Sequence, residues 1–444
     1  MSAPRLAGLL LFALCLAVAA VSAQPGLPPG VKMPPVIKPG TPPGGPKLPG
    51  PGDPKQKIPM PPAPGPGTPG KPGTPPGPGG PSGTMPSKPT DKKDDTKWPD
   101  KVGGKTLAEV VKEMRGNSDP AVREGAVRAL AAFGPKAREV GGQDLVDAMT
   151  KDPDWNVRAA ALEAGPTVLY FQAKSPDTVL NSGVTAMVKS MGSSQLGIRV
   201  TAIVAVGSIG SYMRMLSPQV ITELRTQARD TTTWQLRRLA VAAVGSVGQG
   251  LPLSDDGDQR EPPDTGAVTL LIDVAKTDNC ALVRRDAINA LIGLGPVAGG
   301  QQKKWRSDLD QILKTERDKS VILWTRVCIL RNDPAGVTGN PIHLDAVAKT
   351  LEAPEAQGRI EACQALGILG EEAKSKLQDL LDVIQNDKEE PLVVAAAILA
   401  VAGMKSQVKI IQPILESVKN SHKNADVRKV AQDGIEYVTG RKKN

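Results

Sequence analysis

Histidine and cysteine, the side chains that most often carry catalysis or bind metals, are scarce in this 444-residue chain. The two histidines are His343 and His422, and none of the four cysteines belongs to a CxxC or CxxCH motif. Acid–base and nucleophilic catalysis need converging side chains, and zinc or haem sites need clustered ligands. The sequence therefore predicts no catalytic, metal or cofactor-binding site, and both histidines are expected at the surface near helix ends.

Long apolar runs are also rare. Arg5 is followed by an uncharged, mostly apolar run over residues 6–21, and Val21-Ser22-Ala23 has the small residues of a cleavage site. This order is typical of a secretory signal peptide over residues 1–23, with a mature chain that starts near Gln24. The sequence thus predicts an extracytoplasmic protein, secreted or periplasmic, with an uncleaved anchor as the alternative. No other stretch is expected to span a bilayer.

The net charge of +9 is distributed unevenly. Residues 24–105 contain twelve Lys and five Asp, whereas the chain after residue 105 has 42 basic and 41 acidic residues. A nucleic-acid-binding domain normally concentrates basic charge in its folded part, so no nucleic-acid partner is expected. The basic segment either contacts an anionic envelope surface or polymer weakly, or its lysines only keep it solvated.

Residues 24–90 contain 25 Pro and 15 Gly. This proline density excludes helices, and the segment lacks the apolar pattern that would drive collapse. Residues 24–100 are therefore predicted to be a disordered linker of polyproline II segments separated by glycines. It acts either as a spacer or as a leader without a specific role.

A short pattern recurs nine times in the remaining chain, at a period near 38 residues. An apolar residue, called position zero here, is usually followed by arginine, and alanine stands four residues later. Position zero is Val122, Val157, Ile198, Leu236, Val283, Val321, Gly358, Leu392 and Val427. Steps of 0, 4, 7 and 8 lie on one face of a helix, and small residues there let a neighbouring helix approach closely.

Helix signals surround each copy. Asp119 and Asp154 are at N-cap positions, and Pro120 suits the first helical turn. Five glycines stand twelve residues after position zero, where left-handed caps end helices: Gly134, Gly210, Gly248, Gly295 and Gly370. A second amphipathic run precedes the copies, for example Leu107, Val110, Val111 and Met114. Each unit is therefore a helix pair, A then B, and the repetition predicts an all-α stacked array.

The motif Asp119-x-x-Val122-Arg123-x-x-Ala126-x-x-Ala129-Leu130 and its copies at Val157-Arg158, Val283-Arg284 and Val427-Arg428 resemble the HEAT-repeat family. The resemblance is strongest to the short bacterial HEAT-like repeats that also occur in phycobilisome bilin lyases. It implies an α-solenoid of about nine helix pairs over residues 101–444. It also implies an Asp–Arg ladder between repeats. Copies six and eight have Ile322 and Val393 in place of the arginine, so looser stacking or a bend is expected there.

Four residues are candidates for contacting a partner. Trp155 and Trp234 both precede position zero by two residues, and tryptophan is enriched at binding hot spots. Packing beneath the preceding loop is the alternative for both. Arg238 and Arg285 belong to the Arg237-Arg238 and Arg284-Arg285 pairs, which are either a basic edge for a partner or solvated helix faces.

Two further features have less specific interpretations. Asp255-Asp-Gly-Asp258 lies in the insertion over residues 249–264 but lacks the spacing of a calcium loop, so a solvated acidic loop is expected. This loop could border a binding surface. Cys328 replaces the usual small residue, which indicates a core position. Whether Cys280, Cys328 and Cys363 form a disulfide stays open, with Cys328–Cys363 as one possible pair.

Together these features predict a non-catalytic scaffold or binding protein of the cell envelope. A protein partner is expected first and an envelope polymer second, without prediction of the oligomeric state. Two alternatives stay open: an enzyme similar to the bilin lyases, which the family resemblance implies, and a structural envelope element.

Overall fold

The computed structural model describes residues 98–170, 177–251, 253, 260–296, 301–332 and 341–440. All of them belong to one compact unit, Gly80–Asn444. The predicted signal peptide, the Pro/Gly-rich segment up to residue 97 and the acidic run Asp255–Asp258 lie outside the described residues.

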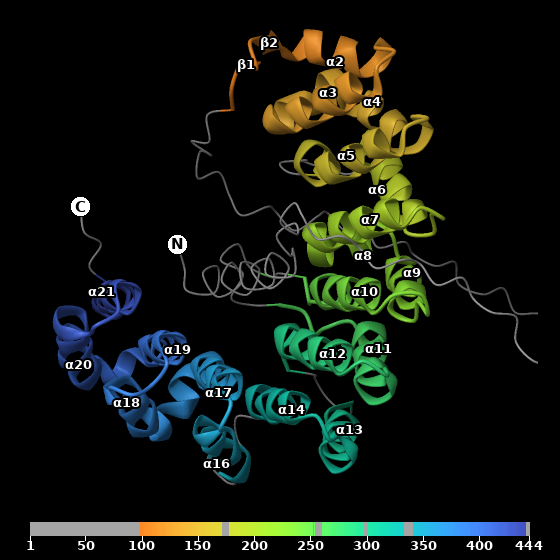
Figure 1. Ribbon diagram of the computed structural model, residues 1–444. Coiled ribbons are helices and arrows are strands. Elements are labelled where there is room, and N and C mark those ends of the chain that lie inside the picture. Colours follow the sequence, from red (N-terminus) through yellow and green to blue (C-terminus); the bar gives the residue numbers. More distant parts are fainter. Residues whose placement is uncertain are drawn as a thin grey trace, which may run out of the picture. The chain divides into compact units, whose positions relative to one another are not determined.

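Nine helix pairs follow one another in the described part of the chain, which confirms the predicted α-solenoid (Figure 1). The A helices are α2 (Leu107–Gly116), α4 (Ala137–Lys151), α6 (Thr178–Ser190), α9 (Val220–Ala228), α11 (Thr265–Thr277), α13 (Gln301–Thr315), α16 (Ile342–Lys349), α18 (Leu377–Gln385) and α20 (Val408–Ser421). The B helices are α3 (Pro120–Ala132), α5 (Trp155–Gly165), α7 (Leu196–Ile209), α10 (Trp234–Val247), α12 (Ala281–Leu294), α14 (Lys319–Asn332), α17 (Ala356–Leu369), α19 (Pro391–Ala402) and α21 (Ala425–Thr439).

Smaller elements connect or precede these pairs. A two-stranded antiparallel hairpin, β1 (Lys101–Val102) and β2 (Lys105–Thr106), leads into α2. A four-residue helix, α8 (Met213–Leu216), precedes α9. Single tight or wide helical turns occupy Gly134–Lys136, Pro166–Tyr170, Gly210–Tyr212, Thr350–Glu352, Gly370–Lys376 and Lys405–Gln407. The hairpin was not predicted, because two-residue strands leave no periodic pattern in the sequence.

The B helices form one row, in which each helix packs on the next, and the A helices form a second row beside it (Figure 1). The alanines four residues after position zero lie in the core between the rows: Ala126, Ala161, Ala202, Ala240, Ala287, Ala362 and Ala431 are all at most 3% exposed. Glycines complete the close approach of neighbouring B helices. A Cβ on Gly207 would lie 3.2 Å from Ala243 Cβ, and one on Gly245 would lie 2.8 Å from Ala290 Cβ. The predicted role of small residues is thus confirmed.

The eighth copy was predicted one residue out of register. Leu392, the predicted position zero, is 71% exposed, whereas Val393 is fully buried. With Val393 as position zero, Ala397 and Ala400 take the two small positions, and Ala400 packs on Gly367 as Ala243 packs on Gly207. The run Ala395-Ala396-Ala397 fits either register, which explains the error. The arginine position of this copy is therefore Val394, and the looser stacking or bend expected at copy eight stays a prediction for the joint between α19 and α21.

The predicted helix ends are mostly correct. Asp119 accepts a hydrogen bond from the Ala121 N–H, and Asp154 accepts from Asn156 and Val157, as N-caps do. Gly134, Gly210, Gly295 and Gly370 have positive φ. Gly248 does not, with φ of −74°. It is needed for space instead, since a Cβ there would lie 2.4 Å from Ala267 Cβ.

The run Leu196–Leu216, which contains α7 and α8, is long and apolar enough by composition to cross a membrane, and the bent pair Pro391–Ala402 and Lys405–Ser421 passes the same test jointly. The expectation that no stretch after the signal would qualify was therefore wrong. In the array, Ile198, Ile203, Val206 and Met213 of this run are buried in the core. A B helix between two other B helices needs apolar residues on several sides, which explains its composition.

Candidate partner-binding surface on the B-helix row

A repeated ion pair fixes five of the joints between neighbouring repeats. In each, the arginine after position zero of one B helix binds an acid at the end of the next A helix. The pairs are Arg123–Asp152, Arg199–Asp230, Arg237–Asp278, Arg284–Glu316 and Arg359–Glu389. We call these the clamped joints. Four of these arginines also donate to backbone oxygens at the start of their own B helix, so one side chain ties three chain segments together.

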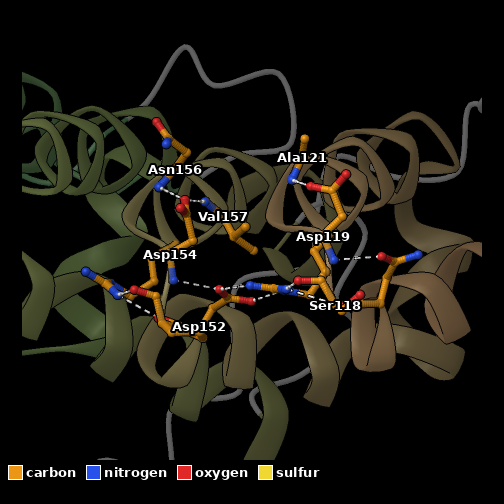
Figure 2. A network of polar contacts seen from close by, with 11 residues as sticks. Ser118, Asp119, Ala121, Asp152, Asp154, Asn156 and Val157 are labelled. Carbon is orange, nitrogen blue, oxygen red and sulfur yellow. Dashed lines mark hydrogen bonds and ion pairs between the residues drawn. The ribbon is translucent and has the colours of Figure 1, made fainter.

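The first clamped joint shows the arrangement in detail (Figure 2). Arg123 Nε and Nη2 each lie 2.8 Å from a carboxylate oxygen of Asp152, and Nη1 donates to the Asn117 and Ser118 oxygens. Asp152 also accepts from the Asp154 N–H at 2.9 Å. The predicted ladder therefore exists, but its acid is Asp152 at the end of the A helix. Asp119 and Asp154, the motif's own aspartates, cap helices instead.

The clamps perturb the acids that form them. Burial acts to raise the pKa of Asp152, but hydrogen bonds from Arg123 and from the Asp154 N–H more than offset it, so the pKa lies below its ordinary value. The pKa values of Asp230, Glu316 and Glu389 are lowered for the same reason, with burial opposing and hydrogen bonds prevailing. These carboxylates are part of the scaffold and stay ionised there.

Copy six departs from the clamp, as expected from Ile322. Its helix α14 is buried even at Leu323 and Val327, which correspond to open positions in other B helices. The helices on either side meet across it: Arg285 Nη1 of α12 lies 3.5 Å from Glu361 Oε1 of α17, and Ser320 of α14 donates to the same Glu361 carboxylate. At this copy, side chains of α12 and α17 therefore meet across α14.

The two predicted arginines are both paired. Arg238 binds Asp286, and its guanidinium carbon lies 5.7 Å from the centre of the Trp234 ring. Arg285 lies 3.5 Å from Asp286 as well as from Glu361. The four charged groups form one neutral chain across α10, α12 and α17, so the alternatives of a free basic edge and of simply solvated arginines are both wrong. A role of this network in partner binding stays a prediction.

The two predicted tryptophans are the first residues of α5 and α10 and remain 46% and 37% exposed. Trp155 extends over the start of the next B helix: a Cβ on Gly197 would lie 3.0 Å from Trp155 Cζ3. It therefore packs forward onto α7, not beneath the preceding loop. Leu196 and Leu282, which are exposed in the same turn of α7 and α12, were not predicted. The repeat alignment already contained this signal, since Leu196 also precedes position zero by two residues.

The B-helix row carries most of the exposed large apolar side chains of the described residues. Eight of thirteen lie on B helices: Trp155, Leu196, Val204, Trp234, Leu282, Leu392, Leu399 and Tyr437. The A-helix row and the connections carry the other five: Val140, Met215, Leu253, Ile342 and Ile410. Scattered exposed apolar residues are ordinary, but their concentration on one row of helices indicates an interaction face.

The groups that could carry chemistry are engaged elsewhere or buried. His343 lies between Arg306 and Arg326, with ring nitrogens 3.1 and 3.3 Å from their guanidinium nitrogens. Burial and the two positive charges lower its pKa. His343 is thus half-buried, not an ordinary surface histidine. Within the described ranges, no group of three or more His, Cys, Asp or Glu side chains could hold a metal ion.

The three described cysteines are free thiols, so the possible Cys328–Cys363 disulfide is not formed. Cys328 is fully buried, as its place among small residues predicted. Burial raises the pKa of the Cys328 and Cys363 thiols. Neither group is therefore a reactive thiolate.

Comparison with known proteins agrees with the architecture. A family model described as HEAT repeats matches residues 100–165. The structure of yeast importin-beta, Kap95p, is similar with a TM-score of 0.54 at 12% identity, over 75% of this chain and 46% of that chain. Kap95 in its complex with Nup1 is similar with a TM-score of 0.51 at 12% identity, over 76% of this chain and 46% of that chain. No curated protein sequence matches.

This chain spans less than half the length of those importin-beta chains, and at 12% identity the similarity concerns the fold alone. The HEAT-repeat match covers residues 100–165, and the stacked helix pairs that follow have the same α-solenoid architecture. The finer resemblance to repeats of bilin lyases rests on the sequence motif only.

Proposed function

We propose that this HEAT-repeat protein is a non-catalytic, exported scaffold that binds a protein partner on the open face of its B-helix row. The observation that carries the proposal is the concentration of exposed apolar side chains on that row. Stacked repeats provide extended surfaces of this kind, and the similar importin-beta structure includes a complex with Nup1. Export is inferred from the signal-like residues 1–23, and an envelope polymer is the second kind of partner.

The clamped joints support a binding role because they use the charged groups to hold the repeats in register. In these Arg–carboxylate pairs both side chains are mostly buried. The pairs hold the B helices in place and expose no charge on the open side of the row. A surface that is fixed in this way is preorganised, so less conformational entropy is lost when a partner binds. Trp155 and Trp234 are the expected anchors, since large aromatic side chains contribute most to protein interfaces.

A matched pair of double variants tests which face binds. Val204→Ser/Leu399→Ser removes two exposed apolar groups from the B-helix row, and Val140→Ser/Ile410→Ser removes two similarly exposed groups from the A-helix row. The full mature chain and both variants are used to capture partners from the native envelope, with quantitative mass spectrometry. We expect at least tenfold weaker capture of the specific partner by the B-row variant only. Equal loss with both variants, or loss with the A-row variant alone, would contradict the proposal.

Two further measurements address export and catalysis. N-terminal sequencing of the protein isolated from its native cells should find a chain that starts near Gln24, whereas a start at Met1 in the cytoplasm would contradict export. A chromophore-loading assay tests the alternative similar to the bilin lyases. We expect no covalent pigment transfer, and its detection would overturn the non-catalytic scaffold.

A further inference from the structure

The joint between α5 and α7 contains half of a clamp. In four clamped joints the arginine donates from Nη1 to backbone oxygens of its own repeat, and from Nε and Nη2 to the two oxygens of the acid. Arg158 keeps the first half, because its Nη1 donates to the Asp152 oxygen at 2.6 Å and to the Pro153 oxygen at 3.1 Å. Its Nε and Nη2 have no acceptor among the described residues and are accessible to solvent. We call these two nitrogens the open edge.

The next repeat does not supply the missing acid. At the first clamped joint, Asp152 binds Arg123 and also accepts a hydrogen bond from the N–H two residues later in the chain. After α6 this place is taken by Ser193, whose hydroxyl accepts from the Gln195 N–H at 3.2 Å. None of the residues 191–193 is acidic. The joint therefore has the arginine of a clamp without a carboxylate for it to bind.

Large apolar side chains lie beside the open edge. Trp155 precedes Arg158 by three residues, so the two side chains are neighbours on the surface of α5. The Trp155 ring crosses to the first turn of α7, where a Cβ on Gly197 would lie 3.0 Å from it. Trp155 and Leu196 both remain exposed at this joint. An accessible guanidinium edge and an apolar surface thus lie together where α5 meets α7.

Arg428 in the last described repeat has the same half clamp without the apolar surface. Its Nη1 donates to two backbone oxygens before α21, and within the described ranges it forms no ion pair either. Ala425 is the residue of α21 that corresponds to Trp155. Arg158 and Arg428 are therefore alike in their own contacts, and only Arg158 lies beside an exposed aromatic ring at a joint between two repeats.

We propose that the open edge of Arg158 binds the carboxylate of an aspartate or glutamate in a protein partner. An apolar residue next to that acid packs on Trp155 and Leu196. A planar carboxylate fits the open edge as Asp152 fits the same edge of Arg123. Backbone hydrogen bonds already hold the guanidinium, so little further ordering of this side chain is needed for binding.

A peptide segment suits this site because it brings a carboxylate and an apolar side chain together. The inference rests on the proposed function, since it names the chemistry of the partner segment that uses Trp155. It adds that the specific charge comes from the partner and that the site for this charge is preformed in the chain.

The first test supplies the acid within the full chain. Ser193→Asp places a carboxylate where the first clamped joint has Asp152, and Ser194→Asp places the same charge one residue away at an exposed position. We expect Ser193→Asp to close the clamp and to raise the urea unfolding midpoint above that of Ser194→Asp. Equal midpoints would overturn the proposal, because the open edge would then not accept a carboxylate.

A random peptide library displayed on phage tests the chemistry of the partner. The library is first depleted on the Ser193→Asp chain and is then selected on the full wild-type chain. We expect the recovered peptides to contain Asp or Glu beside a large apolar residue. Recovery of no peptide, or of peptides without an acid, would overturn the proposal.

Fluorescence polarisation with a recovered peptide measures the contribution of each group. Arg158→Gln and Trp155→Ala should each weaken binding at least about tenfold, whereas Arg428→Gln should change it less than about twofold. Replacing the acid of the peptide by its amide should weaken binding to the wild type by about the same factor as Arg158→Gln, with no further loss when both changes are combined. Independent losses would overturn the proposal, since the two groups would then not bind each other.

The capture experiment on the native envelope separates this inference from the proposed function. If the B-row variant loses the partner and Ser193→Asp keeps it, the proposed function stands and the carboxylate site fails. If only the A-row variant loses the partner, the proposed function fails, whereas the polarisation measurements still decide whether Arg158 binds an acidic peptide.

Discussion

The joint between α12 and α14 and the joint between α14 and α17 connect similar helices by opposite means. At the first, Arg284 binds the nearly buried carboxylate of Glu316. At the second, Ile322 stands in place of the arginine, Ala353 stands in place of the acid, and α14 is buried on its open side as well. The eighth copy exchanges only the arginine for an apolar residue: Val394 is fully buried, and His422 stands after the next A helix in place of the acid. At the joint between α12 and α14 the arginine and the acid are present together, and at the joint between α14 and α17 both are replaced by apolar residues.

This comparison shows which parts of the repeat are essential for stacking. Small residues four and seven places after position zero persist next to both kinds of joint, with Thr325 and Cys328 in α14 and Ala397 and Ala400 in α19, whereas the close Gly–Ala contacts between B helices lie at clamped joints. The space beside these small residues is filled either by the clamp or by buried apolar side chains. A buried ion pair and a well-packed apolar group often have similar net stability, whereas an unpaired charge is strongly unfavourable. This difference favours keeping or replacing the arginine and the acid together, as at the joints of α14 with α12 and α17.

Acidification should weaken four of the five clamped joints together and is the largest expected effect. Asp152, Asp230, Glu316 and Glu389 have pKa values below their ordinary values in the folded chain. The stability that these ionised carboxylates give to the folded chain is therefore complete above their pKa values in the unfolded chain, near 4. It is lost as the pH falls through their lower pKa values in the folded chain. Urea unfolding midpoints of the full chain should fall steadily from pH 5 to pH 3. A midpoint independent of pH in this range would show that the clamps contribute nothing.

A single broken clamp is the next largest effect. Arg284→Ala leaves the Glu316 side chain, which is 7% exposed, without its cation. We expect a loss of about 3 kcal/mol of unfolding free energy, because an uncompensated buried charge remains. Equilibrium urea unfolding measures the loss, and hydrogen exchange should locate it at α12 and α13. Arg128→Ala, which removes exposed ion pairs from α3, is the matched control and should cost less than about 1 kcal/mol. Equal losses would contradict a special role of the clamp.

Converting this joint to the apolar kind should restore most of the stability. Arg284→Ile/Glu316→Ala copies the residues Ile322 and Ala353 of copy six. We expect it to unfold within about 1 kcal/mol of the wild type, since both charges leave together. Its midpoint should also depend less on pH between 5 and 3, because one carboxylate with a lowered pKa is gone. A double variant as unstable as Arg284→Ala would show that the two kinds of joint are not interchangeable.

The sequence predicted the helix pairs, the alanine core and most caps correctly, because each depends on residues a few positions apart. It did not predict which acid faces each arginine, since Asp152 follows Arg123 by 29 residues and only stacking brings them together. Position zero of copy eight was predicted one residue too early, because an alanine stands four residues later in either register. Trp155 and Trp234 were predicted as possible anchors from their position in the repeat, with packing beneath the preceding loop as the alternative. The forward contact of Trp155 with Gly197 depends on the neighbouring helix and could not be predicted.

The joint between α5 and α7 offers the smallest and most specific test. Arg158 donates to the Asp152 and Pro153 backbone oxygens. The A helix that follows, α6, ends at Ser190, and Met191 and Gly192 come after it where other repeats have an acid. Trp155 crosses to Gly197 here, and a Cβ on Gly197 would lie 3.0 Å from its ring. Gly197→Ala should therefore change stability little in the wild type, because the gain in helix propensity is offset by displacement of the ring.

In a Trp155→Ala background the same Gly197→Ala change should stabilise the chain by about 0.5 kcal/mol, since the ring no longer opposes the methyl group. Urea unfolding of the four chains gives this coupling, with Gly293→Ala, where nothing lies within 4 Å of the added Cβ, as the uncoupled control. Zero coupling between Trp155 and Gly197 would mean that the ring does not rest on α7. The joint between the second and third repeats would then lack both the clamp and the aromatic contact, which leaves the apolar core and the Arg138–Asp177 ion pair between α4 and α6 to hold it.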